Sequence, residues 1–134
     1  MSDSPNVQAI KRFVERWNGG DRTPSLEDAH PDIEVSTEIT GAFRGEPFRG
    51  YDGVREWLST IDETFERWEL ELDEIQDRAD DVVVVVGAVK ARGRGSGVEL
   101  DLPTAWVVEF RDGRVLRVRI FRDRAEALAA AGPG

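Results

Sequence analysis

Asp101 is the carboxylate whose sequence surroundings best suit acid/base chemistry, because leucines flank it in a stretch that reads as a central strand. Desolvation disfavours the charged form of a carboxylate, which is what a general acid or base near neutral pH needs. The position of Asp101 in the alternation of the predicted strand allows the opposite interpretation, a side chain that faces solvent. Glu99, Asp101 and Glu109 share a parity that suits a solvent-facing side of a sheet. The sequence leaves both a catalytic and a surface role open for Asp101.

Glu38 and His30 are the other two candidate acid/base residues. Glu38 follows Thr37 in an alternating segment and turns inward only if that strand carries a bulge near Gly41. His30 has the one imidazole of the chain, which suits proton transfer. At a predicted helix end before Pro31 it also suits capping of the last carbonyls. The chain has no Cys, which excludes disulfides and thiolate zinc sites, and we expect no metal and no cofactor.

Charge divides unevenly over the 134 residues, whose net charge is −9. Residues 1–81 carry 21 acidic and 9 basic side chains, net −12, whereas residues 82–134 carry 6 and 9, net +3. An acidic first half argues against nucleic acid as a partner, because phosphate binding depends on cationic side chains. The longest apolar run, 82–89, is far shorter than a membrane span. We expect a soluble, cytoplasmic protein.

The first half of the chain has mainly helical periodicity. Val7, Ile10, Phe13, Val14 and Trp17 share one face of a helix that Ser4-Pro5 begins and Gly19-Gly20 ends. A short helix is predicted over 24–29, and a half-buried strand over 33–39. The segment 41–50, with three Gly and one Pro, predicts a loop. A third helix over about 53–65 is predicted with Asp52 as its cap.

The second half changes to the period of strands. Strands are predicted from Trp68, over 82–91, over 98–110 and over 115–122, with an Asp80-Asp81 turn, a Gly-rich reversal at 93–97 and an Asp112-Gly113 hairpin. Short turns make these four strands an antiparallel meander. Asp123 with Glu126 three residues later predicts a capped closing helix over 124–131.

The order of these segments resembles the nuclear-transport-factor-2-like superfamily and, within it, the SnoaL-like polyketide cyclase group. The resemblance runs from about Val7 to Gly132 and is carried by residues 13–21, 30–35, 49–57, 110–115 and 121–128. It implies an α+β fold: a cone-shaped roll of three N-terminal helices packed in a strongly bent mixed or antiparallel sheet, with a short C-terminal helix. It also implies a single domain over 1–134, a deep apolar pocket and a homodimer formed through the outer sheet face.

The catalytic positions of three related enzyme groups are vacant in this chain. By resemblance, the tyrosine and base of ketosteroid isomerases fall on Phe13 and Thr37, and their second acid on Leu102 or Pro103. The carboxylates of limonene-epoxide-hydrolase-like members fall within 82–86 and on Ile120. The paired histidines of the scytalone-dehydratase type cannot form with His30 alone. A SnoaL-like acid/base in an apolar pocket remains, without a matching motif to place it.

The pocket wall is expected from the inward faces of the first and third helices, the first strand and the last strands. The candidate ligand-binding residues are Phe13, Trp17, Val35, Thr37, Trp57, Trp106, Val118 and Ile120. The alternative is that Trp17 and Trp57 are ordinary core residues. The leading hypothesis is a SnoaL-like protein that binds a small apolar or carbonyl-bearing molecule. Whether it also catalyses a cofactor-free isomerisation, cyclisation or hydrolysis stays open, and the rival hypothesis is a non-catalytic dimeric module.

Overall fold

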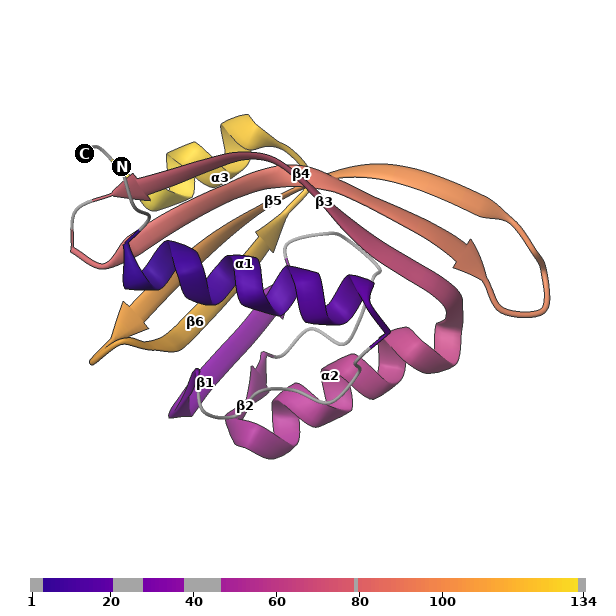
Figure 1. Ribbon diagram of the computed structural model, residues 1–134, viewed down its shortest axis with the longest axis horizontal. Coiled ribbons are helices and arrows are strands. Elements are labelled where there is room, and N and C mark those ends of the chain that lie inside the picture. The colour runs from indigo at the N-terminus through magenta and orange to yellow at the C-terminus, as the bar shows by residue number, and fades with distance from the viewer. Residues whose placement is uncertain (1–3, 21–27, 38–46, 79, 133–134) are drawn as a thin grey trace.

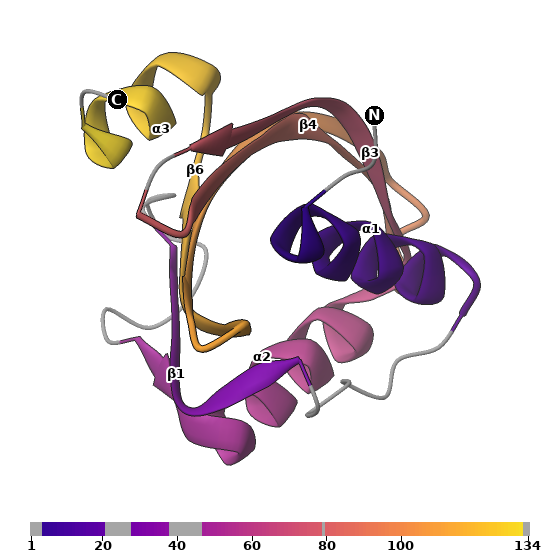
Figure 2. The same cartoon turned by 60° about the vertical axis from the view of Figure 1, so that its left-hand side comes forward.

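Helix α1 (Pro5–Asn18) opens the computed structural model, which describes residues 4–20, 28–37, 47–78 and 80–132. The Ser4 side chain accepts a hydrogen bond from the Val7 amide at 3.2 Å and so caps the helix. Its predicted apolar stripe is buried, with Trp17 only 3% exposed. Figure 2 shows α1 inside the curve of the sheet. The stripe therefore attaches α1 to the concave side.

The next described elements are strand β1 (Ala29–Thr37), strand β2 (Phe48–Arg49) and helix α2 (Gly50–Thr64). Two predictions are corrected here. The end of the predicted loop 41–50 holds β2, which pairs with β1. Helix α2 begins at Gly50, and its N-cap residue Arg49 makes no side-chain hydrogen bond to the helix. Asp52 lies in the first turn instead, where a carboxylate favours the helix dipole and where it accepts a bond from Arg55 at 2.9 Å.

Only the end of the short helix predicted over 24–29 falls within the described residues. Residues 21–27 lie outside the described residues, and Ala29 already belongs to β1. The Ala29 side chain is 6% exposed and packs in the core as a strand residue. His30 is consequently a strand residue and not the end of a helix.

The predicted meander is confirmed. Strands β3 (Phe65–Arg78), β4 (Val82–Gly93), β5 (Glu99–Arg111) and β6 (Arg114–Phe121) pair antiparallel in sequence order. Asp112 and Gly113 both have positive φ, 53° and 77°, as a two-residue hairpin turn requires. Strand β1 joins β6 in parallel, so the sheet is mixed, with the order β2-β1-β6-β5-β4-β3.

Helices lie on both faces of the sheet (Figure 1). Helices α1 and α2 pack on the concave face, over a core that includes Val35, Val83 and Val108. The short helix α3 (Arg124–Ala131) covers part of the outer face, over Val84 and Val107. Asp123 caps α3 as predicted, its carboxylate accepting from the Glu126 amide at 2.9 Å. This α+β arrangement is the predicted cone.

Gly87 lies beside an irregularity in the pairing of β3 with β4. It pairs with Leu72 of β3, and the register of the β3–β4 pair shifts directly afterwards, between Leu72 and Glu74. A Cβ atom on Gly87 would lie 1.9 Å from the Glu71 carbonyl oxygen. No side chain can occupy that space, so this pairing depends on a glycine at this position.

The end of α1 covers part of the free edge of β3. The Asn18 amide group donates to the Leu70 carbonyl at 2.8 Å and accepts from the Leu70 amide at 2.9 Å. The Trp17 indole donates to the Trp68 carbonyl at 2.6 Å. Asn18 therefore takes the two backbone positions that a neighbouring strand would use, which protects this edge from pairing with another chain.

Three side chains of β3 hold both ends of α3, and we term them the α3 clamp: Glu74, Gln76 and Arg78. The Glu74 carboxylate accepts two bonds from Arg124 at the start of α3, at 2.9 and 3.2 Å. Gln76 links Glu74 to Arg78, whose guanidinium donates to the Gly132 carbonyl after the helix. Alternate residues of one strand thus fix the helix on the outer face.

The α3 clamp predicts an acid-sensitive contribution to stability. Hydrogen bonds from Arg124 and then Gln76 lower the pKa of Glu74 from 4.5 to about 2. The contribution is therefore complete above pH 4.5 and disappears as the pH falls through about 2. We expect Glu74→Gln to be less stable than the wild type at pH 6 and equally stable near pH 2, in urea unfolding followed by circular dichroism. Glu15→Gln, on the exposed side of α1, is the control, and a constant difference across this pH range would contradict the assignment.

Candidate functional site

A small cavity lies between α1 and the bent part of the sheet. Its wall is almost wholly apolar, and its volume of about 10 Å³ is close to the space of one water molecule. It is lined by Ile10, Val14, Leu70, Glu71, Leu72, Val85, Gly87, Ala88, Thr104 and Trp106. The described side chains therefore nearly fill this space, and a larger guest must displace some of them.

Aromatic rings line the approach from α1 to this cavity. The Phe13 ring lies 6.1 Å from the Trp17 ring, at 25° between planes, and 6.4 Å from the Trp106 ring. Phe13 and Trp106 are both only partly buried. These two rings are the ones that can move at least cost when the cavity widens.

Two side chains bring polar atoms into the lining of the cavity. The Trp106 indole nitrogen donates to Thr104 Oγ1 at 3.1 Å. Thr104 is 8% exposed and lies two residues before Trp106 on the same face of β5. Glu71 also lines the cavity, but its carboxylate lies 3.9 Å from Lys90 Nζ on the outer face. The Thr104–Trp106 pair is thus the polar feature of this lining.

Of the eight residues expected to bind ligand, Trp106 is the one that lines this cavity. Trp17 and Trp57 are core residues at 3% and 8% exposure, as their alternative interpretation held. Val35, Val118 and Ile120 belong to the buried core of the concave face, and Phe13 packs against this core from α1. Thr37 is the last residue of β1 and pairs with Ile120, and its side chain lies outside the described residues.

Sequence analysis missed Thr104 and Gly87. Both could have been found from the predicted strands, since Thr104 has the parity of Trp106 and an isolated Gly inside a Val-rich strand signals a close backbone approach. The register pairs Gly87 with Thr104. Gly87 and Thr104 both line the cavity.

Asp101 lies on the outer face and not at the cavity. Its carboxylate is 65% exposed and lies 2.5 Å from Lys90 Nζ, and this hydrogen bond raises the pKa of Lys90. Lys90 lies between Val89 and Ala91, whose side chains are buried in the core. Because side chains alternate along a strand, the Lys90 side chain points to the outer face. The structure therefore places Asp101 in the surface role that its parity allowed.

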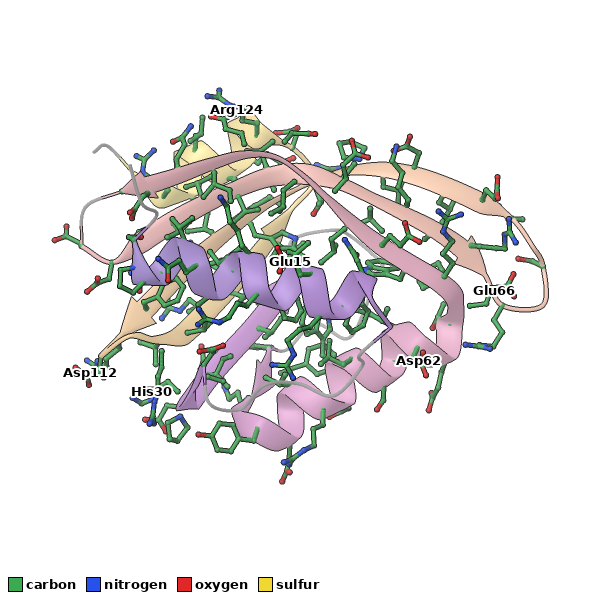
Figure 3. All side chains as sticks on the ribbon, viewed as in Figure 1. Glu15, His30, Asp62, Glu66, Asp112 and Arg124 are labelled. Carbon is green, nitrogen blue, oxygen red and sulfur yellow. The ribbon has the colours of Figure 1, made fainter. Side chains whose placement is uncertain are left out.

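The described part of the structure places neither His30 nor Glu38 at the cavity. Figure 3 shows His30 at the margin of the molecule, at the start of β1. Its Nδ1 accepts a hydrogen bond from the Asp32 amide at 3.0 Å. Glu38 falls outside the described residues.

The described part of the chain holds no group of three or more His, Asp or Glu residues placed to bind a metal ion. No helix within it is long and apolar enough to cross a membrane.

Comparisons with known proteins agree with the fold. The family model of the SnoaL-like domain matches residues 10–118. The crystal structure of TerC co-crystallised with polyporic acid is 26% identical, with a TM-score of 0.77 over 92% of this chain and 95% of that one. An NTF2-like protein of unknown function from Burkholderia pseudomallei is 21% identical, with a TM-score of 0.79 over 92% and 95%. A proposed SnoaL-like polyketide cyclase from a Jannaschia species is 21% identical, with a TM-score of 0.75 over 90% of both chains. No curated protein sequence matches the chain.

Proposed function

Because this chain belongs to the SnoaL-like domain family, we propose that it is a small-molecule-binding protein whose ligand enters the concave face beneath α1. The observation that carries the proposal is the apolar cavity between Val14, Val85 and Trp106, with one buried polar pair in its wall. Apolar linings with few polar groups are typical of small-molecule sites. A flat, mostly apolar molecule suits this lining best, because it can stack on Trp106 and Phe13.

Binding requires the cavity to widen. Small-molecule pockets hold roughly 300 Å³ or more, whereas this cavity holds about 10 Å³. Movement of Phe13 and Trp106 toward solvent is the change that the partial burial of both rings favours. The cost of that movement lowers the affinity, so we expect moderate binding of any single probe.

The experiment uses polyporic acid, an aromatic quinone, as the probe because the related TerC was crystallised with it. We expect the indole N–H signal of Trp106 and the amide signal of Gly87 to shift as polyporic acid is titrated, in ¹H–¹⁵N spectra of the full chain. Trp106→Phe assigns the indole signal. Shifts confined to the outer face, or no shift up to the solubility limit, would contradict the proposal.

A matched pair of variants localises the binding. Val14→Phe adds bulk to the cavity wall, and we expect it to weaken polyporic acid binding at least about tenfold, because the ring occupies the space that the ligand needs. Val98→Phe makes the same change at a residue that is 56% exposed, before β5, and should bind as the wild type does. Equal binding by the two variants would place the ligand elsewhere.

A second candidate function is cofactor-free ring closure of a carbonyl compound on the same face. A carboxylate would remove a proton next to one carbonyl, the resulting carbanion would attack a second carbonyl carbon, and the proton would return to the new alkoxide oxygen. Asp101 cannot do this from the outer face. Glu38 is the remaining candidate carboxylate. It follows Thr37, which pairs with Ile120, so this role requires the bulge after Thr37 that would turn Glu38 inward. Glu38→Gln should abolish such turnover, and Asp101→Asn should leave it unchanged.

We also propose that two copies of the chain pair through the part of the outer face that α3 leaves uncovered. This part projects beyond α1 at the β4–β5 end of the sheet (Figure 1). It carries cross-strand ion pairs, including Arg92 with Glu99 at 2.5 Å and Lys90 with Asp101. We expect a dimer that weakens as salt is added, measured by sedimentation velocity. A monomer at every concentration and at low salt would exclude it.

A further inference from the structure

The hydroxyl of Thr104 is a buried donor without a good acceptor. Its acceptor, the Phe121 carbonyl, lies 3.5 Å away, beyond the usual 2.5–3.0 Å of a hydroxyl-to-oxygen bond. Thr104 is nevertheless only 8% exposed. Because this hydrogen bond is long, the hydroxyl should gain from a nearer acceptor that enters the cavity.

The indole of Trp106 fixes the direction of that hydroxyl. It donates to Thr104 Oγ1 at 3.1 Å and so occupies an acceptor position of the oxygen. The hydroxyl proton must then point away from the indole. Thr104 and its paired residue Gly87 both line the cavity, so a guest there lies close to this side chain.

The other polar side chains near this cavity are already committed. The Trp17 indole donates to the Trp68 carbonyl, and the Asn18 amide group is bonded in both directions to Leu70. The Glu71 carboxylate points to Lys90 on the outer face. Of the described lining, Thr104 is therefore the side chain that can offer a proton to a guest.

We propose that Thr104 is the specificity-determining residue of this site and that it selects flat ligands with a neutral hydrogen-bond acceptor, such as a ketone or quinone carbonyl. The inference rests on the proposed function, because it concerns the same cavity. An isolated carboxylate is a poor guest, since the apolar wall offers no cation to balance its charge. A pure hydrocarbon leaves the hydroxyl unpaired and binds more weakly.

The experiment compares 1-indanone with indane, which share a ring system and differ in the carbonyl. Binding of each to the full chain is followed through the indole N–H signal of Trp106 and by calorimetry. We expect indanone to bind about tenfold more tightly than indane, as one additional hydrogen bond to a buried donor allows. Thr104→Ser keeps the hydroxyl and should keep this preference.

Removal of the donors tests the assignment. Thr104→Val keeps the shape of the side chain and should lose most of the preference for indanone. It also frees the Trp106 indole to donate, so the double variant Thr104→Val/Trp106→Phe, followed by calorimetry, should lose the preference completely. Indane should bind Thr104→Val as it binds the wild type, which separates lost recognition from lost folding.

The outcomes distinguish the two proposals. If indanone and indane bind the wild type equally, or if the double variant still prefers indanone, Thr104 does not select the ligand, although the cavity remains a binding site. If neither compound nor polyporic acid binds, the proposed function itself fails, and this inference fails with it.

Discussion

Gly87→Ala is expected to destabilise the protein by at least about 3 kcal/mol. The added Cβ would lie 1.9 Å from the Glu71 carbonyl oxygen, which is backbone and cannot rotate away as a flexible side chain can. To accept a methyl group, β3 must separate from β4 at the bend, which breaks backbone pairing beside the register shift after Leu72. Urea unfolding followed by circular dichroism measures the loss in the free energy of unfolding. A variant that is largely unfolded at 25 °C without urea would also agree with this prediction.

The matched control is Gly95→Ala, in the reversal between β4 and β5. A Cβ there meets nothing within 4 Å, so the substitution adds only the strain of a positive φ of 86° and should cost about 1 kcal/mol. Equal losses for the two variants would show that backbone conformation, and not the contact with Glu71, explains the glycine. A stable Gly87→Ala protein would mean that the sheet can bend without this close approach.

Trp17→Ala is expected to have the second large effect, a loss of about 3–5 kcal/mol in the free energy of unfolding. The indole is 3% exposed, packs beside Phe13 and donates to the Trp68 carbonyl. The substitution removes a large buried ring and leaves that carbonyl without its donor. Thermal and urea unfolding of the variant would measure the combined loss.

Trp17→Phe separates the two contributions. It keeps most of the buried ring and removes the hydrogen bond to Trp68, so its loss should be about 1–2 kcal/mol. The result also tests the earlier assignment of Trp17 to ligand binding. If Trp17→Ala folds as stably as the wild type but loses affinity for polyporic acid, Trp17 belongs to the binding wall and its core role is wrong.

Local sequence patterns predicted most elements of this fold. Helical spacing located α1 and most of α2, alternation located the meander, and turn chemistry located the Asp112-Gly113 hairpin. Strand β2 was missed because two residues are too few for any periodicity. Phe48 and Arg49 form a strand only because β1 supplies their backbone partners. Elements that local sequence patterns specify could be predicted, whereas β2, which forms only by pairing with β1, could not.

The candidate site was less predictable because pairing between strands forms it. Trp106 was found from its residue type, but the importance of Thr104 depends on Gly87 in the neighbouring strand and on the bend at Leu72. The apolar neighbours of Asp101 favoured a buried carboxylate, whereas the parity that it shares with Glu99 and Glu109 favoured the solvent-facing side. Its place on the outer face is evident only from Lys90, eleven residues earlier in sequence and opposite it in the sheet.

The α3 clamp also works as a ruler for the C-terminal helix. Glu74 and Arg78 are four strand residues apart, about 13 Å, and the eight residues of α3 rise about 12 Å, so the two ends match. One inserted residue would rotate α3 by about 100° and move Gly132 off Arg78 while Arg124 stayed on Glu74. Related chains that keep both contacts should therefore keep the length of this helix fixed, and length variation should accumulate in connections that no such pair of contacts spans.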